Sequence, residues 1–307
     1  MRLRIAVTDN DWFRYLRSLP DVDEVNFWQP SAKQAFRALN PGELLLFKLH
    51  HPQNYIVGGG FFVRYLSLPY PFVWDAFGRK NGAPTLEEMK KQIERYRRSP
   101  VGPNDPIGCI LLRDPFFFDE FLWIEAPADF APNIVRGKTY EPDSATARAL
   151  WEQVQTRLVA SAGQVAEPLL EEEPAMWGDP VLTRRRLGQG TFQLLVTDNY
   201  RRRCAVTGEK ALPVLDAAHI LPVKEGGQHR LDNGLLLRTD VHRLFDAGYV
   251  TVTPDGRFLV SRRLKDDFDN GEPYLPFNGQ RIWVPGDPAS QPNRRALEWH
   301  GDVRFLG

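Results

Sequence analysis

The sequence predicts a two-domain protein of the α+β class. Its 307 residues suffice for two domains of ordinary size, about 100–200 residues each. Segments that alternate like strands are interspersed with segments of helical periodicity. Charge also divides the chain: residues 1–183 carry 20 Lys and Arg against 24 Asp and Glu, a net charge of −4, and residues 184–307 carry 19 against 15, a net charge of +4. We therefore expect domains at 1–162 and 183–307.

An acidic, proline-containing segment is expected to link the two domains at residues 163–182. Composition favours packed cores, because 42% of the residues are hydrophobic and 25% are charged. The apolar runs fall far short of the ~20 residues that a membrane span needs, and residues 1–9 do not resemble a secretory signal. We therefore expect a cytoplasmic protein without membrane contact. Two cysteines are too few for a disulfide scaffold.

The first half alternates predicted strands and helices. Alternating apolar residues predict a strand at 3–7, and Asp11 is expected to cap a helix that Pro20 ends. A capping box of Thr85 and Glu88 begins a second helix, and a third is expected at 144–160. Further strands are expected at 43–49, 55–63, 107–112 and 121–124.

The second half contains the most specific pattern in the chain. It consists of DAAHI at 216–220, DNGLLL at 232–237 and DVHRLFD at 240–246. We expect a helix at 190–200, strands at 214–220 and 234–237, and then a helix capped by Thr239 or Asp240. His242 and Asp246 are four residues apart, so they share one helical face and can hold one divalent ion with open coordination positions. An imidazole base, an orienting amide and metal ligands together suit the hydrolysis of a phosphodiester.

This pattern resembles the HNH nuclease motif of the ββα-metal fold. The resemblance covers roughly residues 190–300. It implies that His219 is the general base, that Asn233 holds the loop and orients His219, and that His242 is a catalytic metal ligand. Many HNH enzymes carry a metal-binding residue immediately before the base, where this chain has Ala218. Asp216 or Asp246 would then supply the carboxylate to a divalent metal, Mg²⁺ or Mn²⁺.

Several other residues of the second half have competing interpretations. Arg243 inside the motif is a candidate phosphate contact, and so is the run Arg201, Arg202 and Arg203, which could equally be a solvated face. His229 lies in a glycine-rich loop and is expected to be solvated. Cys204 and His300 are expected to be packing residues.

The first half is unusually aromatic over residues 25–77. Individually these aromatic residues are best explained as core, but aromatic walls could also hold an extruded base by stacking. The glycines at 58–60 would let the backbone approach a flat ligand closely. The candidate base-binding residues are Trp28, Phe61, Phe62 and Trp74.

The arrangement of the first half is also similar to PUA-like domains of the EVE kind. The resemblance rests on VNFW at 25–28, NPGE at 40–43 and IVGGG at 56–60. It implies a PUA-like β-barrel with helices, in a superfamily several of whose members bind modified bases. We thus expect an N-terminal PUA-like reader domain and a C-terminal ββα-metal HNH domain.

The whole chain therefore resembles modification-dependent bacterial restriction endonucleases. The expected activity is metal-dependent hydrolysis of double-stranded DNA that carries a modified base. One HNH site cuts one strand, so a homodimer is expected when both strands are cut. Two alternatives stay open: a nucleic-acid-binding module whose nuclease centre has decayed, and an endonuclease that acts on unmodified DNA or on RNA.

Overall fold

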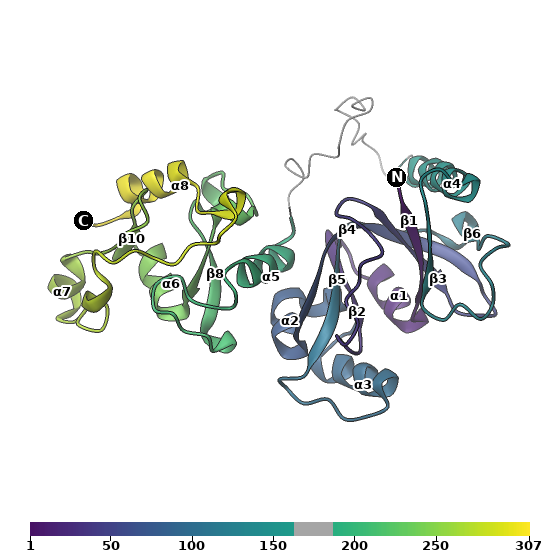
Figure 1. Ribbon diagram of the computed structural model, residues 1–307, viewed down its shortest axis with the longest axis horizontal. Coiled ribbons are helices and arrows are strands. Elements are labelled where there is room, and N and C mark those ends of the chain that lie inside the picture. Colours follow the sequence, from purple (N-terminus) through teal and green to yellow (C-terminus); the bar gives the residue numbers. More distant parts are fainter. Residues whose placement is uncertain (163–186) are drawn as a thin grey trace. The chain divides into compact units, whose positions relative to one another are not determined.

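The computed structural model describes residues 1–162 and 187–307, and the predicted linker at 163–182 lies outside the described residues. The chain divides into two compact units, Met1–Arg185 and Arg186–Gly307 (Figure 1). Both units mix helices and strands, which confirms the α+β class.

The N-terminal unit is built on a seven-stranded mixed sheet. Along the sheet the strand order is β2-β5-β4-β3-β1-β7, and β6 pairs with β4. β1 and β3 are parallel, and the other pairs are antiparallel. The elements of the unit are β1 (Leu3–Thr8), α1 (Asn10–Arg17), β2 (Glu24–Gln29), β3 (Leu44–Leu49), β4 (Tyr55–Pro69), α2 (Tyr70–Phe77), α3 (Leu86–Arg97), β5 (Pro106–Phe117), β6 (Ile124–Glu125), β7 (Gly137–Tyr140) and α4 (Ala145–Ala162).

Hydrophobic residues cover both faces of this sheet. β3 is buried along its whole length, as expected for a central strand packed on both sides. Leu44 and Leu46 face one cluster, which includes Leu150 of α4, whereas Leu45 and Phe47 face another, which includes Trp12 of α1. The period-two alternation of a strand therefore sends alternate residues to different cores.

Three sequence expectations for this unit were wrong in detail. Of the strand expected at 121–124 only the last residue belongs to β6, because Glu120–Leu122 forms a 3-10 helix. The helix α1 is capped by Asp9 rather than Asp11, because the Asp9 carboxylate accepts hydrogen bonds from the backbone N–H groups of Asp11 and Trp12. The glycines at 58–60 lie inside β4 and are buried. A Cβ on Gly58 would lie 2.2 Å from the carbonyl oxygen of Phe116, so this glycine permits close packing of β4 and β5 rather than contact with a ligand.

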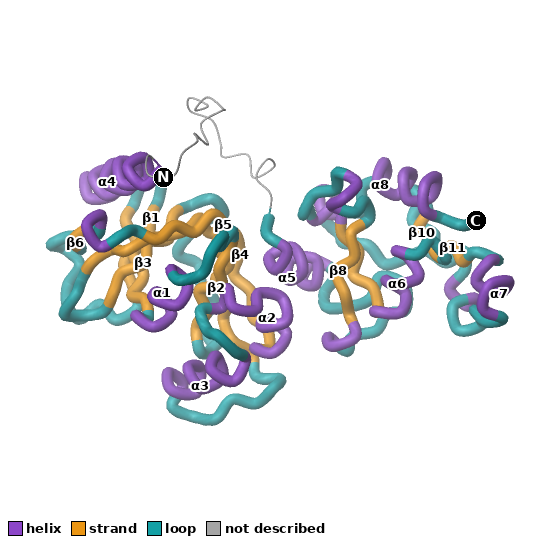
Figure 2. Tube along the Cα trace, turned by 180° about the vertical axis from the view of Figure 1, so that it is seen from behind, coloured by secondary structure: helices purple, strands orange, loops and turns teal. Residues whose placement is uncertain are grey.

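The C-terminal unit has a β-hairpin between two helices. β8 lies between α5 and α6 in both views (Figures 1 and 2), and both helices contact both hairpin strands. Thr239 and Asp240 do not cap α6 with their side chains, because the helix already begins at Thr239 and Asp240 binds Arg238 instead. The elements are α5 (Gln189–Asn199), β8 (Leu215–His219), β9 (Gly234–Arg238), α6 (Thr239–Asp246), β10 (Val250–Val252), β11 (Phe258–Val260), α7 (Arg263–Phe268) and α8 (Arg294–Trp299).

Candidate functional site

The three sequence motifs of the second half form one β-hairpin and the helix that follows it. β8 and β9 are antiparallel, and His219 pairs with Gly234 at one end of the hairpin. A Cβ on Gly234 would lie 2.5 Å from Cγ2 of Val196 and 3.2 Å from the ring of Phe192. Glycine at this position therefore lets α5 pack closely against the strand end that carries His219.

Asn233 holds the loop between the two strands. Its Oδ1 accepts a hydrogen bond from the Leu221 N–H at 2.9 Å, and its Nδ2 donates to the carbonyl oxygens of Leu221 at 2.9 Å and Gln228 at 3.0 Å. Leu221 follows His219 by two residues, and Gln228 immediately precedes His229. One amide therefore fixes the backbone next to both histidines.

His219 is partly buried against an aromatic ring and a second histidine. Its imidazole stacks on Phe192 of α5, with the centroids 4.1 Å apart. Its Nε2 lies 2.9 Å from Nδ1 of His229, so one imidazole donates to the other. Burial, with the nearby His229 and His242, lowers the pKa of His219 to about 4. His219 is therefore neutral at neutral pH, the form that can accept a proton.

The expectation that His229 is merely solvated was wrong. Its imidazole lies 5.0 Å from that of His219 and 5.5 Å from the ring of Phe192, measured between centroids. The sequence offered one signal for this pairing: three of the six histidines fall between residues 219 and 242. Only the fold of the loop shows which two of them touch.

His242 lies between two carboxylates. Its Nδ1 is 3.3 Å from Asp216 Oδ2 on β8, and its Nε2 is 3.4 Å from Asp246 Oδ2 one turn along α6. The two ring nitrogens point to different sides of the imidazole, so one ion bound to His242 can share one of these carboxylates but not both. Accordingly, no group of three His, Cys, Asp or Glu side chains in residues 1–162 and 187–307 forms a metal cage.

The donors nevertheless suit a divalent ion with an open coordination shell. One imidazole and one carboxylate, completed by water and phosphate oxygens, are typical of Mg²⁺ and Mn²⁺. A metal-ligating histidine almost always donates its other ring N–H to a carboxylate, a backbone carbonyl or a water, and here a carboxylate is in place. Ala218 lies two residues after Asp216 on the same face of β8, where it is fully buried and its methyl group offers no metal ligand.

A cavity of about 150 Å³ adjoins His219. Asp246, Lys224 and Arg304 also line it, which places two cations and one carboxylate beside the candidate base. Sequence reasoning missed Lys224 and Arg304. Arg304 is 85 positions beyond His219 in the chain, and no local pattern marks it.

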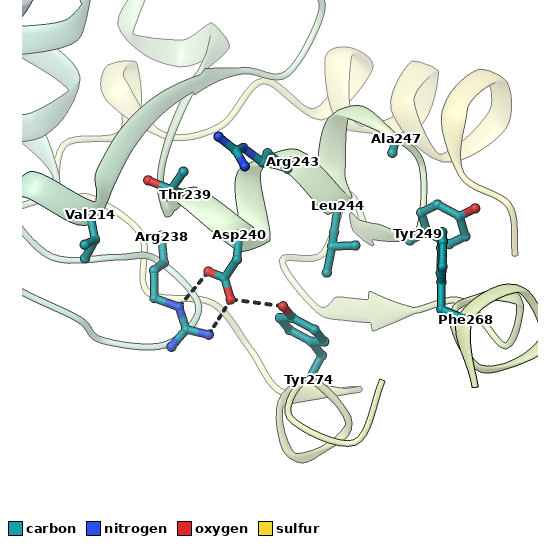
Figure 3. A pocket seen from close by; sticks show the side chains of 10 residues that line it. All are labelled: Val214, Arg238, Thr239, Asp240, Arg243, Leu244, Ala247, Tyr249, Phe268 and Tyr274. Atoms are coloured by element: carbon teal, nitrogen blue, oxygen red, sulfur yellow. Dashed lines mark hydrogen bonds and ion pairs between the residues drawn. The ribbon is translucent and has the colours of Figure 1, made fainter. Parts of the chain in front are cut away.

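The arginines chosen from the sequence lie elsewhere. Arg243 lines a separate hollow of about 640 Å³ beside α6, with apolar neighbours such as Leu244 and Phe268 (Figure 3). In that hollow Arg238 binds the carboxylate of Asp240 through Nε and Nη2, and the Tyr274 hydroxyl donates to the same carboxylate. Arg201, Arg202 and Arg203 follow the end of α5, and none of them lines the cavity at His219.

The N-terminal unit has a hollow of about 520 Å³ that we call the aromatic hollow. The ring centroids of Trp28 and Tyr96 on its wall are 6.3 Å apart, and Trp28 Nε1 donates to the Asn81 carbonyl oxygen at 2.9 Å. The Asp9 carboxylate accepts hydrogen bonds from Arg95 and the Tyr96 hydroxyl. The lining residues are Val7, Asp9, Trp12, Phe27, Trp28, Gln29, Pro30, Ser31, Lys33, Gln34, His50, Tyr96, Val135 and Arg136.

Of the four aromatic residues selected from the sequence for base binding, only Trp28 lines this hollow. Phe62 is buried in the core against Phe36, so its faces are not free to stack on a base. Phe61 points away from Phe62 along β4 and lies beneath Arg113. Trp74 belongs to α2, outside the hollow.

Comparison with known proteins identifies the hairpin and helix. Residues 204–253 match the family model described as HNH endonuclease. These residues form an HNH endonuclease domain. The match includes the hairpin with His219 and Asn233 and the helix with His242. An HNH endonuclease domain makes the chain a nuclease and implies DNA as its substrate, and HNH endonucleases generally use divalent metal ions.

Two solved structures have low similarity to the chain. An ASCH protein from Zymomonas mobilis matches over 52% of this chain and 94% of that chain, with 13% identity and a TM-score of 0.32. A structure described as the modification-dependent TagI restriction endonuclease matches over 99% of this chain and 81% of that chain, with 13% identity and a TM-score of 0.29. Scores this low establish neither a shared fold nor a shared activity. No curated protein matches the chain.

No helix within residues 1–162 and 187–307 combines the length and the apolar composition that a membrane-spanning helix requires.

Proposed function

We propose that this protein is a metal-dependent endonuclease that hydrolyses double-stranded DNA containing a modified base. The observation that carries the nuclease part is the HNH domain, in which Asn233 holds the loop beside His219 and His242 contacts Asp216. The choice of modified DNA rests on the aromatic hollow of the other unit.

In the proposed reaction His219 accepts the proton of the attacking water. When its Nε2–H donates to His229, its Nδ1 carries the lone pair that takes this proton. An anionic phosphate in the adjacent cavity raises the pKa of His219 from about 4 towards neutrality, because negative charge favours the protonated ring. Lys224 and Arg304 neutralise that phosphate.

We assign the metal to His242 and Asp216, with Asp246 as the carboxylate that orients His242. The side chain of Asp216 is 40% exposed and is held on a strand, whereas that of Asp246 is 59% exposed near the end of a helix. The better-fixed carboxylate makes the better ligand. When bound, a divalent ion such as Mg²⁺ or Mn²⁺ supplies positive charge to the scissile phosphate and the leaving oxygen.

Base recognition is assigned to the aromatic hollow. Its volume lies in the range of small-ligand pockets, and the rings of Trp28 and Tyr96 offer surfaces for stacking. Asp9 and Gln34 place polar groups in the same hollow. A base extruded from the duplex could therefore stack and be read by hydrogen bonds, as a PUA-like reader domain requires.

The proposal is tested by cleavage of plain, methylated and hydroxymethylated DNA with Mg²⁺ or Mn²⁺. We expect the wild-type protein to cleave a modified substrate. His219→Ala should bind DNA but not cleave it. His51→Ala, which changes an exposed histidine of the other unit, should cleave like the wild-type protein. Trp28→Ala is expected to lose the preference for modified DNA. Nicked circles at low protein concentration and linear DNA at high concentration would support two protomers per double-strand break.

The same assay decides between the proposal and its alternatives. If the wild-type protein cleaves no substrate, it is a binding module whose nuclease centre has decayed. Equal cleavage of plain and modified DNA would make it an endonuclease of unmodified DNA. The decayed centre stays an alternative because Ala218 supplies no metal ligand at the position before His219.

A further inference from the structure

A second hollow in the N-terminal unit is lined by basic residues without any acidic one. We call it the basic hollow, and its volume is about 590 Å³. Its cations come from β1, from the segment between β2 and β3, and from the residue before β7. The basic residues that line it are Arg4, Lys33, Arg37 and Arg136.

The cations of this hollow have neutral partners. Arg4 Nη1 donates to Thr139 Oγ1 at 2.8 Å, its Nη2 donates to the Gly137 carbonyl oxygen at 3.3 Å, and its guanidinium lies over Phe36. Arg136 Nη1 donates to Gln34 Oε1 at 2.7 Å. Burial of Arg4 lowers the pKa of its guanidinium, because nothing nearby compensates the charge.

Lys33 and Arg37 complete this set of charges. Both side chains are exposed, and within the described ranges neither they nor Arg4 and Arg136 take part in an ion pair between side chains. Elsewhere in the unit arginines commonly pair with carboxylates, as Arg17 does with Asp119. Four unneutralised cations around one concave surface produce a field that attracts anions.

The basic hollow adjoins the aromatic hollow. Five residues line both of them: Phe27, Gln29, Lys33, Gln34 and Arg136. Lys33 and Arg136 therefore stand at the junction. The position of Arg136 is fixed further by its carbonyl oxygen, which accepts a hydrogen bond from the Val7 N–H at 3.2 Å.

We propose that the basic hollow binds backbone phosphates of the DNA strand whose base enters the aromatic hollow. Planar guanidinium groups suit the oxygens of a phosphodiester, and a phosphate next to an extruded base lies within a few ångströms of it. This inference names a second part of the site used in the proposed function and rests on that function. The phosphate contacts hold the strand in position, and the aromatic hollow reads the base.

The test measures DNA affinity of the full chain against salt concentration. The double variant Lys33→Gln, Arg37→Gln removes two exposed charges without disturbing an ion pair. The control is Lys91→Gln, which removes one exposed charge of α3 together with its ion pair to Glu88. We expect the double variant to bind plain and modified duplexes about 5- to 50-fold more weakly. Its log–log salt slope should fall by about one unit for each lost phosphate contact. Lys91→Gln should keep the wild-type slope.

An unchanged slope in the double variant, or the same decrease in Lys91→Gln, would overturn the inference. This outcome is separable from failure of the proposed function. A wild-type protein that binds plain and modified DNA equally contradicts modified-base reading, whereas the change of slope is measured on plain DNA alone. Trp28→Ala should show the opposite behaviour. It should lose the discrimination between plain and modified DNA but keep the wild-type salt slope of DNA affinity.

Discussion

At the scale of single residues, chemistry depends on which nitrogen or oxygen of a side chain is free. His219 has His229 at one ring nitrogen and Phe192 stacked on its ring face. His242 has a carboxylate at each of its two ring nitrogens. The roles of these imidazoles therefore follow from their partners rather than from their residue type. Two predictions belong at this scale.

The first concerns His229 as the residue that positions His219. Replacement of His229 by Ala removes the partner of His219 Nε2, so the base no longer keeps one tautomer. We expect a 10- to 100-fold lower kcat with little change in KM. His229→Gln should restore part of the rate, because its side-chain oxygen can accept the Nε2–H. Single-turnover cleavage and ¹⁵N chemical shifts of His219 measure both effects.

The matched control for this prediction is Gln228→Ala. It changes the neighbouring loop residue but keeps the backbone carbonyl that Asn233 binds. Wild-type kcat in His229→Ala, or equal defects in the Gln and Ala variants, would contradict a positioning role.

The second concerns the metal ligands. Asp216→Asn should raise the concentration of Mn²⁺ needed for half-maximal activity more than tenfold and weaken Mn²⁺ binding measured by calorimetry. Asp246→Asn should have a smaller effect, because the amide oxygen still accepts the His242 Nε2–H. A larger effect of Asp246→Asn than of Asp216→Asn would contradict this assignment. It would make Asp246 the metal ligand and Asp216 the carboxylate that orients His242.

At the scale of elements, the hairpin depends on close packing against α5. Gly234→Ala places a methyl group 2.5 Å from buried Val196, in a strand that cannot move away without disturbing His219. We expect a loss of about 1–3 kcal/mol in the free energy of unfolding and lower cleavage activity. Urea unfolding measures the loss. The comparison variant is Gly256→Ala, where a Cβ meets open space but φ is +82°, so its loss of stability reports backbone strain alone. Stability unchanged by Gly234→Ala would show that α5 has room to move.

At the scale of the whole molecule, buried histidines make stability depend on pH. Burial lowers the pKa of both His219 and His300 from the usual 6.5 to about 4. His300 is 2% exposed, with its Nε2–H donating to the Phe245 carbonyl oxygen and its Nδ1 accepting from the Thr251 hydroxyl. This confirms the packing role expected from the sequence.

Between pH 6.5 and about 4 the unfolded chain binds protons that the folded chain does not. The free energy of unfolding must therefore fall as the pH falls through this window, by roughly 3 kcal/mol at most for His300 and by less for the more exposed His219, where solvent screens the charge. His300→Gln should flatten the dependence, measured by urea unfolding in EDTA, relative to the wild-type protein. Equal slopes for the two proteins would show that folding does not lower the pKa of His300.

Features that depend on residues close together in the chain were predicted correctly from local sequence patterns. The spacing of DAAHI, DNGLLL and DVHRLFD located the hairpin, the helix and the residues His219, Asn233 and His242, because strand and helix periodicity convert short spacings into geometry. The sequence also predicted correctly that Cys204 is a buried core residue, since cysteine is among the residue types most often buried.

Contacts between residues far apart in the chain could not be predicted from the sequence and are seen only in the folded structure. Loop closure by Asn233 brings His229 to His219, and the C-terminal segment brings Arg304 to the same cavity. The folding of the first half buried Phe62, left Trp28 on a hollow and gathered Arg4, Lys33, Arg37 and Arg136 around another. Such contacts depend on how the chain packs in three dimensions, and no local sequence period encodes them.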